Sequence, residues 1–412
     1  MPRAPFERHR HNPPMHSPKP LAIALAGMLS LAVAMGIGRF AFTPLLPMML
    51  HDGVINLPTA SWLATANYLG YWLGAMACAL QPWVWSRWPG LRPVVHTSAV
   101  RMGLVATVLL TCGMAWHWPV VWPLWRFLAG VISAVVFVYT SGWCLARLAA
   151  LGAPRLSGII FVGPGLGITV SGLAATAMVA SGVTAATGWL AFGALAVVLT
   201  ALAWPQLHGK VPATPPPAGP SGAASHGEVA VLALAYGLAG FGYIITATFL
   251  PVIARQALPG SVWLDLFWPL LGLGVAAGAL LTIRLPVHWD RRHLLMGCYA
   301  MQACGVLMGV YLPSLLGFAL GSLLIGLPFT AITLFAMQEV RRLRPHGASA
   351  LIGLLTAVYG VGQIAGPPLV AWLLHHSASP AQGFAVSLQI AAGTLLIGVA
   401  LYGWLVRRYP LH

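Results

Sequence analysis

The sequence predicts an all-α membrane protein in which twelve spanning helices form two related six-helix bundles. Three observations support this fold class: the composition, a repeat that links the two halves, and the placement of the basic residues. The chain of 412 residues is 59% hydrophobic and only 7% charged, whereas soluble proteins carry about 25% charged residues. Apolar segments long enough to cross a bilayer as helices recur along the chain. The composition therefore excludes an ordinary soluble globular protein.

Glycines and prolines recur at constant offsets between the two halves of the chain. One offset matches Gly36, Gly38 and Pro47 with Gly240, Gly242 and Pro251. A second offset matches an arginine and three glycines, namely Arg147, Gly158, Gly165 and Gly167 with Arg342, Gly353, Gly360 and Gly362. Two parallel six-span repeats of this kind are expected to form a ligand site between them, near the middle of the membrane.

Composition also divides the chain into segments. Residues 1–20 form a basic tail, 21–205 the first six-span bundle, 229–406 the second, and 407–412 the C-terminal end. Residues 206–228 are rich in Pro, Gly, Ala and Ser and are expected to form a flexible linker.

The basic residues lie on one side of the predicted membrane. Of the 21 Lys and Arg residues, all but Arg39, Arg101, Arg126 and Arg255 fall in the tail, the linker, the C-terminal end or loops on that side. The positive-inside rule places this side, with both termini and the linker, in the cytoplasm. Because the basic residues are spread over short loops and form no single cluster, we expect no nucleic-acid partner.

Arg39 is the most informative residue, because it lies inside an apolar segment that runs from Leu21 to Leu50. An arginine near the middle of a spanning helix costs about 2.5–3.5 kcal/mol on insertion scales, so it normally faces a partner or a watery cavity. At helical spacing, Arg39 shares one face with Gly36, Phe40 and Thr43. We expect this face to line the cavity, with Arg39 binding a carboxylate or phosphate.

A structural role for Arg39 is the alternative, with its guanidinium satisfied by helix-end carbonyls or reaching toward the membrane surface. Gly36 and Gly38 are expected to let another helix or a ligand come close. Pro44 and Pro47 are expected to end or kink this helix at its outer end.

Further polar residues lie in otherwise apolar spans and are candidates for lining the cavity. They are Asn67, Tyr68, Arg126, Tyr243, Tyr359 and Gln363. Tyr243 occupies the position equivalent to Arg39 in the second half, and Tyr359 and Gln363 are one turn apart on one face. For the uncharged residues the alternative is a hydrogen bond between helices, worth about 0.6 kcal/mol. For Arg126 the alternative is that its side chain reaches the outer surface, and Arg101 is expected to reach the inner one.

Acidic residues near the membrane are few. Asp265 lies near the outer end of span 8 and Glu339 at the inner end of span 10, so either is a candidate proton-coupling group. For Glu339 an ion pair with Arg341, Arg342 or the arginines of the loop between spans 8 and 9 is the favoured account. No acid lies at the centre of a span, which disfavours a cationic ligand and a central carboxylate relay.

The motifs of the chain resemble those of the major facilitator superfamily (MFS) over about residues 21–406. The runs Gly36–Pro47 and Ala66–Tyr71 are similar to the YbfB/YjiJ-type permeases of that superfamily, which are bacterial inner-membrane proteins. Arg126 and Gly130 match its span-4 motif Arg-x-x-x-Gly, whose arginine the resemblance implies in proton coupling. Gly163, Pro164 and Gly167 are similar to the span-5 motif of drug/proton antiporters, although Ile168 stands where a further glycine is usual.

The resemblance implies a secondary transporter that works by alternating access as a monomer in the bacterial inner membrane, coupled to protons and directed toward export. The residues favour a small organic anion or a neutral solute as its substrate. Multidrug/proton antiport of apolar compounds is the alternative within transport. A membrane sensor or enzyme is the alternative outside it, although no nucleophile–base or metal constellation is evident. We therefore expect no enzymatic activity, no metal and no cofactor.

Overall fold

The computed structural model describes residues 19–88, 90, 94–209, 225–261, 263–286, 289–344 and 348–411, and every regular element in them is a helix. The predicted basic tail at 1–20 lies almost entirely outside the described residues. So does most of the predicted linker, since residues 210–224 are not described.

The first bundle contains six spans, three of which are built from more than one helical segment. Span 1 joins α1 (Pro20–Leu31), the π-helical segment η1 (Ala32–Arg39) and α2 (Phe42–His51). Spans 2, 3 and 4 are α3 (Leu57–Arg87), α4 (His96–Gly113) and α5 (Trp122–Ala150). Span 5 joins η2 (Pro154–Leu156), α6 (Ser157–Ile160) and α7 (Val162–Ala180), and span 6 joins α8 (Ala185–Ala203) to η3 (Trp204–Gln206).

The second bundle repeats this arrangement. Span 7 is α9 (His226–Ala257), and span 8 joins η4 (Leu264–Leu266) to α10 (Phe267–Thr282). Span 9 is α11 (Arg291–Tyr311), and span 10 is broken into α12 (Leu315–Gly326) and α13 (Phe329–Leu343). Spans 11 and 12 are α14 (Ala348–His376) and α15 (Pro380–Arg408).

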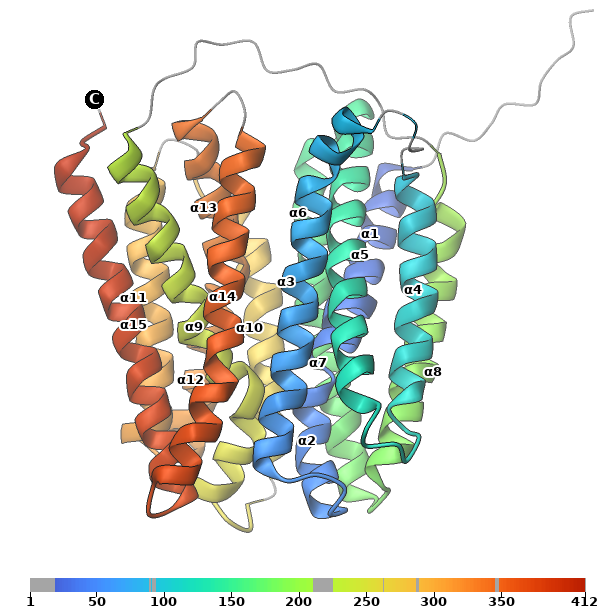
Figure 1. Ribbon diagram of the computed structural model, residues 1–412, viewed down its shortest axis with the longest axis vertical. Helices are drawn as coiled ribbons and strands as arrows, with labels where there is room; N and C mark the ends of the chain where they lie inside the picture. Colours follow the sequence, from blue (N-terminus) through green and yellow to red (C-terminus); the bar gives the residue numbers. More distant parts are fainter. Residues whose placement is uncertain are drawn as a thin grey trace, which may run out of the picture.

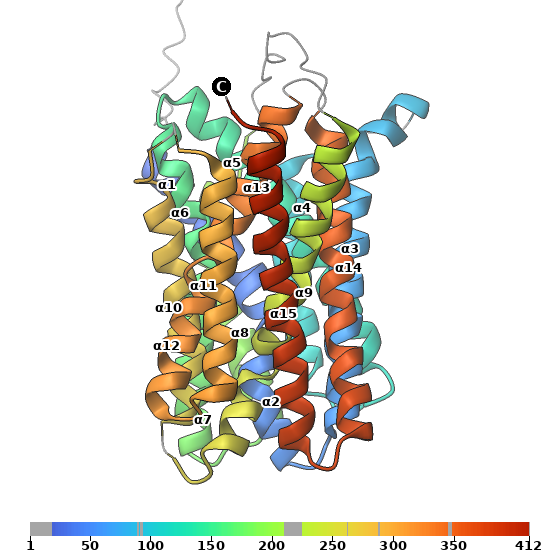
Figure 2. The same cartoon turned by 90° about the vertical axis from the view of Figure 1, so that its left-hand side faces the viewer.

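Within the described residues, ten helical segments are long and apolar enough to cross a membrane. The two remaining spans, α3 and α4, run beside them through the length of the molecule (Figure 1). The view turned by 90° shows the helices running from one end of the molecule to the other (Figure 2). The predicted fold class, an all-α polytopic membrane protein of twelve spans, is therefore confirmed.

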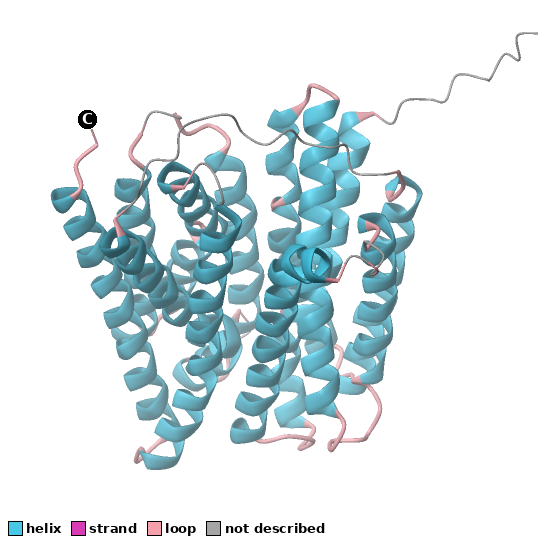
Figure 3. Cartoon of the chain, turned by 45° about the horizontal axis from the view of Figure 1, so that its top comes forward, coloured by secondary structure: helices cyan, strands magenta, loops and turns pink. Residues whose placement is uncertain are grey.

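The helices form two groups that lie side by side (Figures 1 and 3). The described part of the chain begins and ends at the same end of the molecule, where α1 starts and α15 finishes (Figure 1). We call this end the terminal end and the other the opposite end. Arg39, Tyr71, Tyr243 and Gln363 each lie near the middle of their spans, so they share one level between the two ends.

Glycines make the same helix crossing in both bundles. A Cβ atom on Gly36 of span 1 would clash with the backbone of Gly167 in span 5. In the second bundle, a Cβ atom on Gly362 of span 11 would clash with span 7 at Gly237 and Gly240. Small residues allow this close approach of helices in membranes. The repeat seen in the glycines thus corresponds to a repeated contact.

The prediction that Pro44 and Pro47 end span 1 is wrong, because the helix continues through both prolines to His51. An interruption of the helix does accompany Pro44: it lies at Phe40 and Ala41, and Phe40 is four residues earlier, where a proline ring disturbs a helix. Pro44 lies in the first turn of α2, where backbone N–H groups have no intrahelical partner, so its missing N–H costs little.

Candidate functional site

Arg39 lies at the break in span 1, where the π-helical segment η1 ends. A π-helical segment is rare and leaves backbone groups without their usual α-helical partners. Arg126 of α5 supplies donors for two of them: its guanidinium donates to the carbonyl oxygens of Gly38, at 3.3 Å, and Arg39, at 3.0 Å. Arg126 is almost fully buried. These two bonds therefore hold the irregular turn of span 1 against span 4.

Asn67 of α3 extends the same network. Its side-chain amide donates to the carbonyl oxygen of Arg126, at 2.9 Å. Asn67 thus makes the interhelical bond that the sequence offered as the alternative to a ligand contact. The alternative for Arg126, a side chain that reaches the outer surface, is wrong, because its guanidinium is buried and bonded to span 1. The predicted roles of Asn67 and Arg126 in substrate binding stay predictions, as does the role of Arg126 in proton coupling.

The Arg39 side chain reaches across the interface between the bundles. Its Nη2 donates to Oε1 of Gln363 in α14, at 2.7 Å. The amide nitrogen of Gln363 donates in turn to the hydroxyl of Tyr243 in α9. Arg39, Gln363 and Tyr243 are 4%, 1% and 2% exposed, so the chain of bonds is buried. Arg39 and its repeat equivalent Tyr243 therefore meet at one side chain, Gln363.

Among the described residues, no carboxylate pairs with the buried guanidinium groups of Arg39 and Arg126. The acidic residues that the structure describes are Asp52, Glu228, Asp265, Asp290 and Glu339, and each of them lies at one end of the molecule. Their ion pairs, within the described ranges, are with residues at those same ends. The middle of the interface thus carries two positive charges and, among the described residues, no negative one.

Aromatic rings surround Arg39. Its guanidinium lies 3.8 Å from the ring centroid of Tyr71, 5.2 Å from that of Phe40 and 5.5 Å from that of Tyr68. Phe40 also belongs to a series of ring contacts that joins it to the second bundle. In order the series runs through Trp268, Phe40, Phe329, Tyr243, Tyr359 and Tyr236, with centroid distances between 4.6 and 6.3 Å.

Four of these rings, Tyr71, Trp268, Phe329 and Tyr236, are additions to the candidates found from the sequence. Phe329 follows Pro328, where span 10 is broken, and Trp268 precedes Pro269 in the first turn of α10. An aromatic residue beside a proline within a span is the signal that could have found these two. Phe329 also brings the break in span 10 against the break in span 1, because its ring lies 6.1 Å from that of Phe40.

Thr43 and Tyr68 join the bundles on the opposite-end side of Arg39. The hydroxyl of Thr43 donates to the carbonyl oxygen of Ala247, at 2.8 Å. The hydroxyl of Tyr68 lies 2.8 Å from that of Thr248. Residues 31–49 and 242–254 are buried throughout. Spans 1 and 7 are therefore packed tightly together on this side.

The motif glycines of span 5 serve helix packing. A Cβ atom on Gly163 would clash with the Met28 carbonyl group, and one on Gly167 would clash with span 1 at Ala32 and Gly36. Pro164 lies between them and is buried. Gly38 faces Thr107 of α4. Their predicted role in conformational change is not tested by these contacts.

The two acidic candidates lie in ion pairs at opposite ends of the molecule. Asp265 pairs with Arg255. Glu339 pairs with Arg342 at 2.6 Å and lies 3.9 Å from Arg292, so the favoured ion pairs of Glu339 are present. Coupling roles for Asp265 and Glu339 stay predictions.

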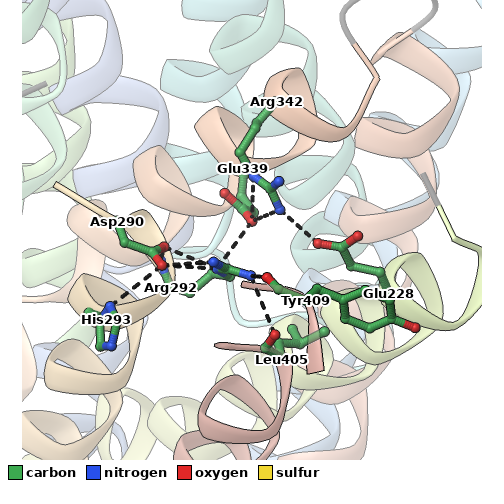
Figure 4. A network of polar contacts seen from close by, with 8 residues as sticks. All are labelled: Glu228, Asp290, Arg292, His293, Glu339, Arg342, Leu405 and Tyr409. Atoms are coloured by element: carbon green, nitrogen blue, oxygen red, sulfur yellow. Dashed lines mark hydrogen bonds and ion pairs between the residues drawn. The ribbon is translucent and has the colours of Figure 1, made fainter. Parts of the chain in front are cut away.

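Glu339 belongs to a network that ties four helices of the second bundle together at the terminal end (Figure 4). Arg342 also pairs with Glu228 of α9, at 2.7 Å. Arg292 pairs with Asp290 at 2.8 Å and donates to the carbonyl oxygen of Tyr409, at 2.5 Å. Burial alone would raise the pKa of the Asp290 carboxyl group, but hydrogen bonds from Arg292 and its charge lower this pKa below its usual value.

Comparisons with known proteins agree with this architecture. The family model described as "Uncharacterised MFS-type transporter YbfB" matches residues 31–402. A search of curated proteins gives no match.

Solved transporters share the fold at low sequence identity. The nucleoside transporter NupG has a TM-score of 0.66 at 12% identity, covering 94% of this chain and 99% of that one. A D-xylose-proton symporter has a TM-score of 0.68 at 12% identity, with 92% and 96% covered. A bacterial homologue of the human lysosomal transporter Spinster, inward-facing and unoccupied, has a TM-score of 0.63 at 14% identity, with 95% and 98% covered.

Proposed function

The chain belongs to the family of YbfB-type MFS transporters, and from that premise we propose that it carries a small organic anion by alternating access, with Arg39 as the group that binds the anion. As a member of this family it is a membrane transporter and not an enzyme. The observation that carries the proposal is the buried guanidinium of Arg39, between the two bundles and bonded to a neutral amide.

Charge at the centre of the interface favours an anion over a cation. A buried, uncompensated guanidinium is costly, and a carboxylate that pairs with it relieves that cost. Arginine also offers two parallel N–H donors that match the two oxygens of a carboxylate. Because the described acids lie at the ends of the molecule, a cationic substrate would find no partner at this level.

Gln363 occupies the place that the anion would take. Its Oε1 accepts from Arg39 at 2.7 Å, as a carboxylate oxygen would. A carboxylate makes a stronger, charge-assisted bond to arginine than a neutral amide does. The anion therefore displaces Gln363 from Arg39 and, in doing so, breaks a direct bond between the two bundles. Substrate binding and rearrangement of the bundles are linked through this one side chain.

The remaining contacts support alternation between two states. Thr43 and Tyr68 join the bundles on the opposite-end side of the site, so the described structure corresponds to a state closed at that end. Trp72 also joins the bundles on the terminal-end side, because its indole nitrogen donates to the carbonyl oxygen of Ala357 at 2.9 Å. We place the terminal end in the cytoplasm, on the evidence of the basic residues, and the protein in the bacterial inner membrane. Export coupled to protons remains the expectation from the span-5 motif.

A second candidate, efflux of apolar compounds, is favoured by the aromatic series around Phe40 and Tyr243. The two candidates differ in their dependence on Arg39, because an apolar substrate needs no guanidinium. Transport of a neutral substrate would likewise be distinguished from anion transport, because it would not depend on the charge of Arg39.

Thermal stabilisation of the purified protein in detergent tests the proposal. The panel contains organic carboxylates and phosphates, neutral metabolites and lipophilic cations. A ligand at 100 times its Kd stabilises the folded state by about 2.7 kcal/mol. We expect stabilisation by anions that is lost in Arg39→Ala. The control is Arg101→Ala, because Arg101 lies near the terminal end, where it donates to the Trp204 carbonyl oxygen at 3.3 Å. Stabilisation by lipophilic cations that is indifferent to Arg39 would overturn the anion model.

A further inference from the structure

The surroundings of Arg39 also bear on what the anion is attached to. The guanidinium carbon lies over the Tyr71 ring, 3.8 Å from its centroid, with the ring centroids of Phe40 and Tyr68 within 5.5 Å. The faces of these rings attract the positive charge electrostatically and surround it with apolar carbon atoms. An anion that reaches Arg39 must therefore pass its remaining atoms along ring surfaces.

These surfaces extend away from Arg39 into the second bundle. Phe40 contacts Phe329 at 6.1 Å, Phe329 contacts Tyr243 at 4.9 Å, and Tyr243 contacts Tyr359 at 6.1 Å. The Phe40–Phe329 and Phe329–Tyr243 pairs are edge-on, at 73° and 82°. Edge-on and offset pairs are the arrangements that aromatic rings prefer. A further flat ring can join such a series without disturbing it.

Three rings of this set retain partly exposed surface. Tyr71, Phe329 and Tyr359 are half-buried, whereas Phe40, Trp268 and Tyr243 are fully buried. The exposed parts belong to α3, α13 and α14, which come from both bundles. Tyr359 already stacks on Tyr236 and Tyr243, and Arg39 lies over Tyr71, so an incoming ring would meet the uncovered parts of these three residues, from both bundles, at the level of Arg39.

Several side chains near Arg39 are bonded to one another. Gln363 bonds Arg39 and Tyr243, the Tyr68 hydroxyl bonds Thr248, and the Asn67 amide nitrogen bonds the backbone of Arg126. The buried Nε atoms of Arg39 and Arg126 and Oδ1 of Asn67 have no partner among the described residues, but a sugar acid carries more hydroxyl groups than these three atoms can bond, so it would also have to break bonds of the network. A ring with one carboxylate needs only the Arg39–Gln363 bond to break.

Resting on the proposed function, we propose that the substrate class of this site is a small carboxylate carried on a flat aromatic ring. The carboxylate takes the place of the Gln363 oxygen on Arg39. The ring lies among Tyr71, Phe329 and Tyr359, continuing the aromatic series that joins the two bundles.

Four probes, three of them of matched size, test this on the unmodified protein in detergent, by isothermal titration calorimetry. Benzoate carries both features, cyclohexanecarboxylate lacks the flat ring, benzamide lacks the charge, and propionate lacks the ring altogether. We expect a Kd for benzoate at least tenfold lower than that for cyclohexanecarboxylate, weaker binding still for propionate, and no binding of benzamide.

Two variants then test which residue causes the preference for benzoate over cyclohexanecarboxylate. Phe329→Leu should reduce the ratio of the two Kd values to near one while leaving cyclohexanecarboxylate binding in place. The control is Phe318→Leu, because Phe318 is a buried ring of the same bundle that stacks on Phe267, outside the aromatic series. It should leave the ratio unchanged. If Phe329→Leu does not fold, the four-probe comparison on the unmodified protein still decides.

The outcomes separate this inference from the proposed function. Equal Kd values for benzoate and cyclohexanecarboxylate, both lost in Arg39→Ala, would overturn the aromatic class and keep the anion site. Benzamide binding as tightly as benzoate, or no carboxylate binding at all, would overturn the anion site itself.

Discussion

Replacing Gln363 with glutamate puts a permanent carboxylate where the transported anion is expected to bind. The Gln363→Glu side chain has the same length, and its oxygen replaces one that already lies 2.7 Å from the Arg39 guanidinium. Both side chains are at least nine-tenths buried. The variant should therefore behave as a protein with its anion site already filled.

The expected effect on binding follows from what the incoming anion must break. In the natural protein it leaves the Gln363 amide without its partner, which costs about 1–3 kcal/mol. In Gln363→Glu it leaves a buried carboxylate without its cation, which costs about 3–5 kcal/mol. The difference of about 2 kcal/mol corresponds to a Kd weakened by roughly thirtyfold. Gln363→Leu, which has no bond to break, should instead bind the anion more tightly, by about fivefold or more.

Calorimetric titration with benzoate measures these changes. The matched control is Gln302→Glu, because Gln302 is equally buried but donates to the backbone carbonyl of Ile325, at 3.2 Å, instead of meeting a guanidinium. That variant should be less stable, since its carboxylate is buried without a cation, and should keep the Kd of the natural protein. Undiminished benzoate binding by Gln363→Glu would refute the displacement of Gln363.

Three further predictions concern packing and stability. Arg126→Lys should lower the free energy of unfolding by about 2 kcal/mol, because a lysine carries its donors on one nitrogen and cannot place separate nitrogens on the Gly38 and Arg39 carbonyl oxygens as the guanidinium does. Thermal unfolding checks this, and Arg101→Lys, whose arginine makes one hydrogen bond of 3.3 Å at the edge of the protein, should change it little. Gly36→Ala should destabilise the protein by about 1–3 kcal/mol, because the added methyl group forces spans 1 and 5 apart. The control Gly297→Ala, which has open space around it, should not. Equal melting temperatures of the two variants would contradict the close approach of Gly36 to Gly167. Folding lowers the pKa of Asp290, so the stabilisation by this carboxylate is complete above the unfolded pKa of about 3.9 and is lost as the pH falls below that value. Asp290→Asn keeps the helix cap but has no carboxylate to titrate. Its melting temperature should therefore fall less steeply than that of the natural protein between about pH 5 and pH 3, the range in which aspartate titrates.

The overall architecture could be predicted because it depends on local sequence patterns that recur along the chain. The length of the apolar segments sets the number of spans, and the recurrence of Gly36 as Gly240 indicates two copies of one bundle. A glycine in a spanning helix marks a close approach wherever it meets another helix. The residue that faces such a glycine on the neighbouring helix can also be expected to be small. Which residue faces Gly36 depends on the level at which the two helices cross, so Gly167 could not be identified from the sequence.

The site could be predicted only residue by residue. Periodicity assigns Arg39, Phe40 and Thr43 to one face of span 1, but it does not say which helix lies opposite. The bond from Arg39 to Gln363 joins residues from spans 1 and 11, and no local pattern records such a distance in sequence. The π-helical turn at Ala32–Arg39 was missed for a similar reason, because its carbonyls are satisfied by Arg126 from another helix.

The residues of the Arg39–Gln363 pair are not repeated in the other half of the chain, and this explains why only one side of the site carries the pair's guanidinium. The two bundles make the same crossing at Gly36 and Gly240, so Arg39 and Tyr243 occupy equivalent places on either side of the interface. The position in span 5 that corresponds to Gln363 is Ile168, an apolar and buried residue. One half therefore supplies the guanidinium to an amide from the other half, and no second copy of this polar pair exists. A symmetric site would hold two like charges face to face, which repel in a low-dielectric interior. With Tyr243 in place of a second arginine, the site keeps one anion contact and gains a ring beside it, as a substrate with one carboxylate and one flat apolar body requires.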